Sequence, residues 1–256
     1  MLSRILLSLI AVGTLASAQT VVTLNTASYR LDQISVSSPG AYASAFPPQG
    51  STFAGVTTST TGTIPYLTSL GGVTVAIDGT NVPVQFAGPG QINFLVPYTM
   101  TPGLKTLKVT SPGGSISGSL RVLSAAPGLF FLTTDTAKPP SARALNQDGV
   151  TVNSTTSPVK RGDVISLYGT GPGVFDKTVV DGSAPGGNPL VRTVSTPQVL
   201  IGGVEANVGF SGLSPQFPGL WQLNVTVPSQ SFITGRVPVV VFVDGVDSNE
   251  VTIVVQ

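Results

Sequence analysis

Short stretches in which apolar and polar residues alternate recur along the whole chain, separated by glycine and proline. In residues 221–227 every odd position is apolar and every even position is polar. A period of two places alternate side chains on opposite faces of a β-strand, so the single Trp, Trp221, is expected to face the core; an exposed sugar-binding ring is the alternative. The 30 Gly and 21 Pro interrupt the chain too often for long helices, while Val- and Thr-rich runs favour strands. The pattern therefore predicts an all-β protein.

One unit of this pattern occurs twice. Residues 73–88 match residues 197–212, and the QINFLVP of residues 91–97 matches the QLNVTVP of residues 222–228. In both copies the sequence predicts a strand, a tight turn and a second strand. The turns fall at Asp-Gly and at Gly-Gly, dipeptides that supply the positive φ angles of hairpin turns. The second copy also carries an insertion, residues 213–218. The matched positions are Ile77 with Ile201, Gly79 with Gly203, Val84 with Val208, Phe86 with Phe210 and Gly88 with Gly212.

Each copy holds roughly six or seven short strands in about 100 residues, which fits an immunoglobulin-like sandwich. We therefore predict two tandem immunoglobulin-like β-sandwich domains after a signal peptide. The expected segments are the signal peptide at 1–18, the first domain at 19–124, a connector at 125–140 and the second domain at 141–256. Because the connector begins with an apolar run, we expect it to pack against the sandwiches instead of moving freely.

The N-terminal residues have the three parts of a secretory signal. Arg4 supplies a positive start, residues 5–15 are mostly apolar, and the Ala-Ser-Ala of residues 16–18 is a cleavage site of small residues. An uncleaved membrane anchor is the alternative, but the apolar stretch is about half of the ~20 residues that span a bilayer. We expect no transmembrane segment in the mature chain. The predicted location is extracellular or periplasmic, and attachment to the cell surface is left open.

The charge balance argues against nucleic acid as a partner. Cleavage removes Arg4 from the 12 basic residues and leaves 11 of them against 11 acidic residues. Nucleic acid binding needs clustered Lys and Arg that displace counterions from the phosphates, and only 9% of this chain is charged. The same argument applies to anionic membrane surfaces. An extracellular protein or a glycan is the expected partner.

The sequence contains no His and no Cys. This composition removes Ser-His-Asp and Cys-His catalysis, the common zinc sites and the non-haem iron triad. Paired carboxylates could still serve a glycosidase, but most of the few acids lie in predicted turns. We expect no enzyme activity and no cofactor. Calcium needs only oxygen ligands, and the weak candidates for it are Asp176, Asp181, Asp244 and Asp247.

Amide side chains on two strands are the main binding candidates. Gln91 and Asn93 in the first copy correspond to Gln222 and Asn224 in the second, and all four lie on the face opposite the predicted core. These amides form either a structural side-chain network or a polar docking surface. Phe217, beside them in the inserted segment, adds an aromatic ring that could bind a ligand.

Several motifs together resemble a known family. They lie at residues 68–75, 89–94, 126–130, 146–149 with 153–154, and 165–171. These motifs are similar to those of the uncharacterised C-terminal domain family first described in Solibacter-type acidobacterial secreted proteins. The resemblance covers residues from about 24 to 256, and it implies a bacterial extracellular protein with sandwiches of the IPT/TIG immunoglobulin-like type. It implies no activity and no site residues.

These observations favour a non-catalytic extracellular module for binding or adhesion, with a protein or glycan as its ligand. A structural spacer, or an assembly subunit that uses exposed sheet edges, is the alternative. A carboxylate-based glycan-active enzyme is the third and least favoured hypothesis.

The composition leads to a first prediction. Because the chain has no disulfide to reduce and no His or Cys to hold zinc, its thermal unfolding midpoint should be the same with and without a thiol reductant or a zinc chelator. A shift of the midpoint in either reagent, measured by circular dichroism on the mature chain, would contradict this expectation.

Overall fold

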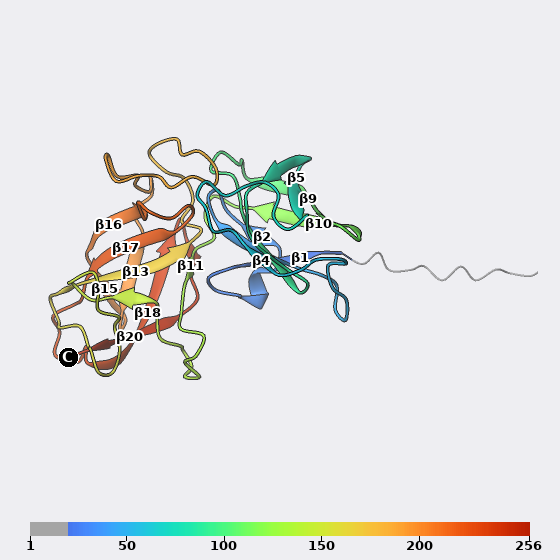
Figure 1. Cartoon of the computed structure of the whole chain (residues 1–256). Coiled ribbons are helices and arrows are strands. Elements are labelled where there is room, and N and C mark those ends of the chain that lie inside the picture. Colours follow the sequence, from blue (N-terminus) through green and yellow to red (C-terminus); the bar gives the residue numbers. More distant parts are fainter. Residues whose placement is uncertain (1–19) are drawn as a thin grey trace, which may run out of the picture.

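The computed structural model describes residues 20–256; the predicted signal peptide, residues 1–18, lies outside the described residues. The regular structure consists of strands and one short 3-10 helix, η1 (Leu31–Gln33). Figure 1 shows these strands gathered in two bodies, one coloured blue to green and the other yellow to red. Within residues 20–256, no helix has the length and apolar character that crossing a membrane requires.

Two five-stranded sheets form the first sandwich. Sheet 1 has the order β1 (Val22–Asn25), β3 (Tyr42–Phe46), β8 (Gln91–Leu95), β7 (Val84–Gly88) and β4 (Ser59–Thr60). Sheet 2 has the order β2 (Val36–Ser37), β10 (Gly114–Val122), β9 (Gly103–Ser111), β5 (Thr74–Ile77) and β6 (Thr80–Val82). The short pairing of β2 with β10 is parallel. The two sheets enclose an apolar core that includes Ile92, Phe94 and Leu107.

Two more sheets form the second sandwich. Sheet 3 contains β11 (Gly128–Leu129), β13 (Val164–Thr170), β17 (Trp221–Thr226) and β16 (Val208–Leu213), with β12 (Ala144–Leu145) also paired to β13. Sheet 4 contains β15 (Val204–Ala206), β14 (Gln198–Ile201), β18 (Gly235–Val243) and β19 (Val246–Asp247), with β20 (Val251–Val255) also paired to β18. A separate apolar core fills the space between them. The predicted all-β architecture of two tandem sandwiches is confirmed, and part of the expected connector, 125–140, is strand β11 of sheet 3.

The duplicated unit has the same backbone irregularity in both sandwiches. In the first, the register between β7 and β8 shifts between Val84 and Phe86, so that Phe86 pairs with Asn93. In the second, the register between β16 and β17 shifts between Val208 and Phe210, so that Phe210 pairs with Asn224. An extra residue in one strand re-aims the side chains beside it. The bulge therefore places the two Asn residues in equivalent positions.

Trp221 fills the centre of the second core. It is 0% exposed, and its Nε1 donates a hydrogen bond to Ser211 Oγ at 3.0 Å. A buried indole needs a partner for its N–H group, and Ser211 supplies one. The predicted core position is confirmed, so Trp221 is not a surface platform for sugars.

The outer edges of β16 and β20 in the second sandwich are covered. Next to β20, Ala142 donates its backbone N–H to Thr252 and Val159 donates its own to Val254. Next to β16, Leu213 donates its backbone N–H to Val191. Such coverage removes the unpaired backbone groups through which a sheet recruits another chain. These two edges are therefore not open to the assembly alternative, which relies on exposed sheet edges.

The inserted segment of the second sandwich docks on the first sandwich. The Tyr42 hydroxyl donates to the carbonyl oxygen of Pro218, and the N–H of Gly219 donates to the Tyr98 hydroxyl at 2.8 Å. A Cβ on Gly219 would lie 2.5 Å from Leu95 Cδ1. Burial raises the pKa of both tyrosines, so each stays a neutral hydroxyl that can donate or accept. The junction is therefore closely packed and hydrogen-bonded.

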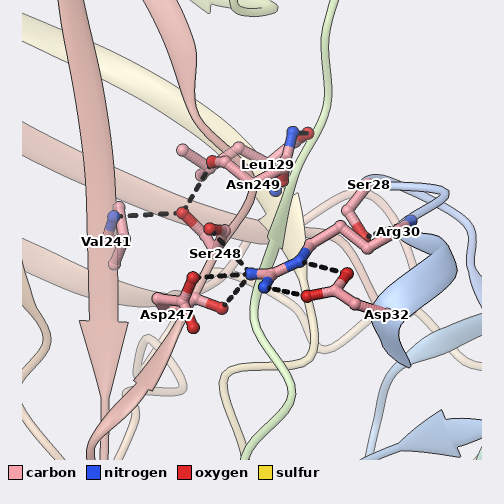
Figure 2. A network of polar contacts seen from close by, with 8 residues as sticks. All are labelled: Ser28, Arg30, Asp32, Leu129, Val241, Asp247, Ser248 and Asn249. Carbon is pink, nitrogen blue, oxygen red and sulfur yellow. Dashed lines mark hydrogen bonds and ion pairs between the residues drawn. The ribbon is translucent and has the colours of Figure 1, made fainter.

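A second contact joins the sandwiches through Arg30 (Figure 2). Its Nη1 donates to Asp247 Oδ2 at 2.8 Å and to the carbonyl oxygens of Asp247 and Ser248, both at 3.0 Å. Its Nε and Nη2 bind the carboxylate of Asp32 in the first sandwich. One guanidinium thus uses its fork of donors on both domains, and this fixes their relative orientation at a second point.

The core position of Trp221 yields a prediction. Trp221→Ala should destabilise the chain by about 3–5 kcal/mol, because it leaves a cavity in the core and removes the partner of Ser211. Chemical denaturation measures the loss. Phe232→Ala is the control, because Phe232 is 66% exposed and surface changes cost within about 0.5 kcal/mol. An unchanged midpoint for the Trp221 variant would contradict the core assignment.

The junction yields another prediction. Gly219→Ala should push Leu95 and Tyr42 away and undock the two sandwiches, so that one thermal transition separates into two. Gly186→Ala is the matched control, because Gly186 also has a positive φ, +77°, but a Cβ there meets nothing within 4 Å. The control variant has similar backbone strain and should keep a single thermal transition. Two transitions in both variants would show that strain, and not the junction contact, controls the coupling.

Candidate functional site

The predicted amides of the first sandwich form a side-chain network on the outer face of sheet 1. Asn93 Oδ1 accepts hydrogen bonds from Gln91 Nε2 at 2.7 Å and from Ser44 Oγ at 2.8 Å. Gln91 Nε2 also lies 3.1 Å from the Tyr29 hydroxyl. Gln91 and Asn93 lie on the side away from the core, because their strand neighbours Ile92 and Phe94 point inward, and Ser44 pairs with Asn93 on the adjacent strand. The network holds the Asn and Gln side chains in fixed positions.

The second sandwich repeats this network on the outer face of sheet 3. Asn224 Oδ1 accepts hydrogen bonds from Gln222 Nε2 at 2.9 Å and from Ser166 Oγ at 3.1 Å. Ser166 pairs with Asn224 in the strand register, as Ser44 pairs with Asn93 in the first sandwich. The structural network that the sequence offered as one interpretation is therefore present in both copies.

The insertion loop, residues 213–219, places an aromatic ring between the two outer faces. Its base is held by the contacts of Pro218 and Gly219 described above, and Thr170 Oγ1 also donates to the Gly219 carbonyl at 3.2 Å. Directly before this anchored base, Phe217 is 48% exposed. A surface ring on an immobilised loop loses little conformational freedom when it binds a ligand.

Two adjoining cavities flank Phe217. The large cavity, about 620 Å³, lies over sheet 3 and is lined by residues that include Tyr168 and Gln222. The small cavity, about 300 Å³, lies toward sheet 1 and includes Asn93 and Tyr42. Both are lined by Phe130, Phe217 and Leu220. We call the two together the junction groove; its parts fall within the range of about 300–1,000 Å³ that is typical of ligand sites.

The structure brings most of the predicted binding residues to this groove. Phe217 and Gln222 line the large cavity, and Asn93 lines the small one. Gln91 and Asn224 support them from the two networks without lining either cavity. The groove is apolar with a few fixed polar groups, which is the usual character of a binding site.

Sequence reasoning missed many lining residues of the large cavity, among them Phe130, Leu132, Arg143 and Tyr168. Phe130 and Leu132 lie in the segment that was expected to be a packed connector. Tyr168 alternates with the core residue Leu167 in β13, so strand periodicity could have placed it on the outer face with Gln222. The sequence carries no comparable signal for Arg143.

The four calcium candidates have structural roles instead of forming a cluster. Asp176 accepts the N–H of Arg192, Asp181 accepts the N–H of Tyr98, and Asp247 pairs with Arg30. Asp244 occupies a turn with φ of 49°. Across residues 20–256, no three acidic side chains are placed to hold a metal ion.

No protein-family model and no curated protein matches the chain. Among solved structures, it is similar to the SGBP-B protein of a Bacteroides ovatus mixed-linkage glucan utilization locus, in complex with a heptasaccharide (12% identity, TM-score 0.33, 90% of this chain and 46% of that one). A biofilm-associated protein domain gives 15% identity and a TM-score of 0.27 over 86% of this chain and 28% of that one. A tandem of titin immunoglobulin domains gives 11% identity and a TM-score of 0.22 over 86% of this chain and 91% of that one.

The chain thus spans less than half the length of the first two structures. These similarities concern the arrangement of strands in sandwiches. The resemblance to the Solibacter-type family stays a prediction from the sequence motifs.

Proposed function

We propose that this protein is a secreted, non-catalytic binding module that holds a carbohydrate chain in the junction groove. The observation that supports the proposal is the position of Phe217, exposed on an anchored loop between two cavities that each contain a fixed amide. An aromatic ring matches the apolar C–H face of a sugar, while amides donate to and accept from sugar hydroxyls. The groove offers both kinds of group side by side.

The absence of a catalytic role is also part of the proposal. Asp176 and Asp181 already accept backbone hydrogen bonds, and Asp247 pairs with Arg30. The hydrogen bond from the Arg192 N–H and the contact with Lys177 lower the pKa of Asp176. Within the described chain, neither cavity of the groove is lined by an Asp or a Glu. A glycosidase needs two carboxyl groups on either side of the scissile bond, and the groove does not offer them.

A structural spacer is the second candidate, favoured by the junction. The contacts of Gly219 and Arg30 hold two domains in one orientation, which a rigid spacer also requires. A spacer would keep its function when the groove is altered, so substitutions in the groove separate the two candidates.

The test of the proposed function is a binding measurement with matched variants. Phe217→Ala should weaken binding to the best soluble oligosaccharide from a glycan array by about tenfold or more, since aromatic anchors often contribute most of the binding energy. Phe232→Ala is the control, because it also removes an exposed phenyl ring but lies outside both cavities. Isothermal titration calorimetry measures both. Equal loss in both variants, or no oligosaccharide bound by the parent chain, would refute the proposal.

A further inference from the structure

The large cavity contains one charged side chain. Arg143 is the only charged residue among the described residues that line either part of the groove. It takes part in none of the ion pairs found in residues 20–256. A cationic group without a protein partner, on the wall of a mainly apolar cavity, favours an anionic group in the ligand.

Arg143 lies in a row with two other polar side chains. It directly precedes β12, in which Ala144 pairs with Leu167 of β13. The next residue of β13, Tyr168, pairs in turn with Gln222 of β17. Because Ala144 and Leu167 point into the core, Arg143, Tyr168 and Gln222 lie on the opposite, outer face. Three neighbouring positions across sheet 3 thus present a guanidinium, a phenol and an amide to the cavity.

These polar groups have capacity that the protein does not use. Burial alone raises the pKa of Tyr168, with no hydrogen bond contributing, so its hydroxyl is neutral and available. Gln222 donates through Nε2 to Asn224, which leaves its Oε1 as an acceptor. A ligand in the cavity therefore meets a charged donor, a hydroxyl and an acceptor along one line, with Phe130 and Phe217 at the side.

We infer that the large cavity is a subsite for a uronic acid residue of the bound glycan; this rests on the proposed function. A hexuronate ring carries a carboxylate, hydroxyl groups and an apolar C–H face together. The carboxylate binds the Arg143 fork, the hydroxyls bind Tyr168 and Gln222, and the ring face packs on Phe217. The small cavity, which has no charged lining residue among those described, takes an adjoining sugar through Asn93.

An acidic peptide is the competing ligand, and the fold disfavours it. Extended peptides commonly bind by adding a strand to an open sheet edge, where main-chain groups give the affinity. The floor of the large cavity is a sheet face, whose backbone groups are already paired within sheet 3. The cavity can therefore offer side chains only, and these match a sugar ring with its peripheral hydroxyls.

The test compares two forms of one sugar. Tetragalacturonate and its fully methyl-esterified form share the same sugar rings and hydroxyl groups, but the ester carries a neutral methyl ester in place of each carboxylate. Oligomannuronate extends the test to another stereochemistry. For one or both of these sugars, the parent chain should bind the acid form at least about tenfold more tightly than the methyl ester. This is the difference expected from one charge-assisted hydrogen bond. Raising the salt concentration should narrow this difference.

Variants then assign the difference to Arg143. Arg143→Gln should reduce the preference for the acid form to within about twofold, and Arg143→Lys should restore part of it, because lysine keeps the charge without the fork. Arg121→Gln is the control, because Arg121 is exposed on β10 and lines neither cavity. It should leave the preference intact. Thermal midpoints confirm that each variant is folded.

The other outcomes separate this inference from the proposed function. Equal binding of acid and ester that is lost in Phe217→Ala but kept in Arg143→Gln would overturn the uronate subsite and leave glycan binding in place. No binding of any oligosaccharide by the parent chain, together with an acidic peptide that binds through Arg143, would overturn both.

Discussion

The packing of Gly219 against Leu95 and Tyr42 positions the aromatic ring that both cavities of the junction groove share. The insertion loop leaves sheet 3 and reaches the outer face of sheet 1, where a side chain on Gly219 would have no room. Two buried tyrosines then hold the main chain of the loop, Tyr42 through Pro218 and Tyr98 through Gly219. Because this base is fixed, Phe217 lies between the outer faces of sheet 1 and sheet 3. Its ring lines the cavities on both sides and so joins them into one groove.

The duplication gives the two sandwiches the same polar outer face, and the groove is formed by the features in which the two copies differ. Both copies have the bulge and the Ser-Asn-Gln network, so each alone offers a polar face. The second copy adds the insertion loop with Phe217, and it receives Phe130 from the segment between the copies. Arg143 adds charge to one side only. The groove between the two repeated domains therefore has two different ends, a charged one over sheet 3 and an uncharged one toward sheet 1.

The sequence predicts what depends on local periodicity. Alternation placed Trp221 in the core and Gln222 on the opposite face, and the Asp-Gly and Gly-Gly dipeptides marked turns whose residues have positive φ. The contacts of Tyr42, Tyr98 and Arg30 could not be predicted in this way. Their partners are more than 100 positions away in the chain, in another domain, and nothing in the local pattern encodes how two domains dock. Arg143 entered the site for the same reason, through the fold of the segment around it.

The covered edges of β16 and β20 have a consequence for association between copies of the protein. With 12 basic and 11 acidic residues in the whole chain, mutual repulsion between copies is weak at neutral pH. At these two edges, resistance to association then depends on backbone groups that residues 140–142 and 191–193 have already paired. Salt screens charge but leaves such pairing intact. These two edges thus stay closed to another chain in dilute and concentrated salt alike.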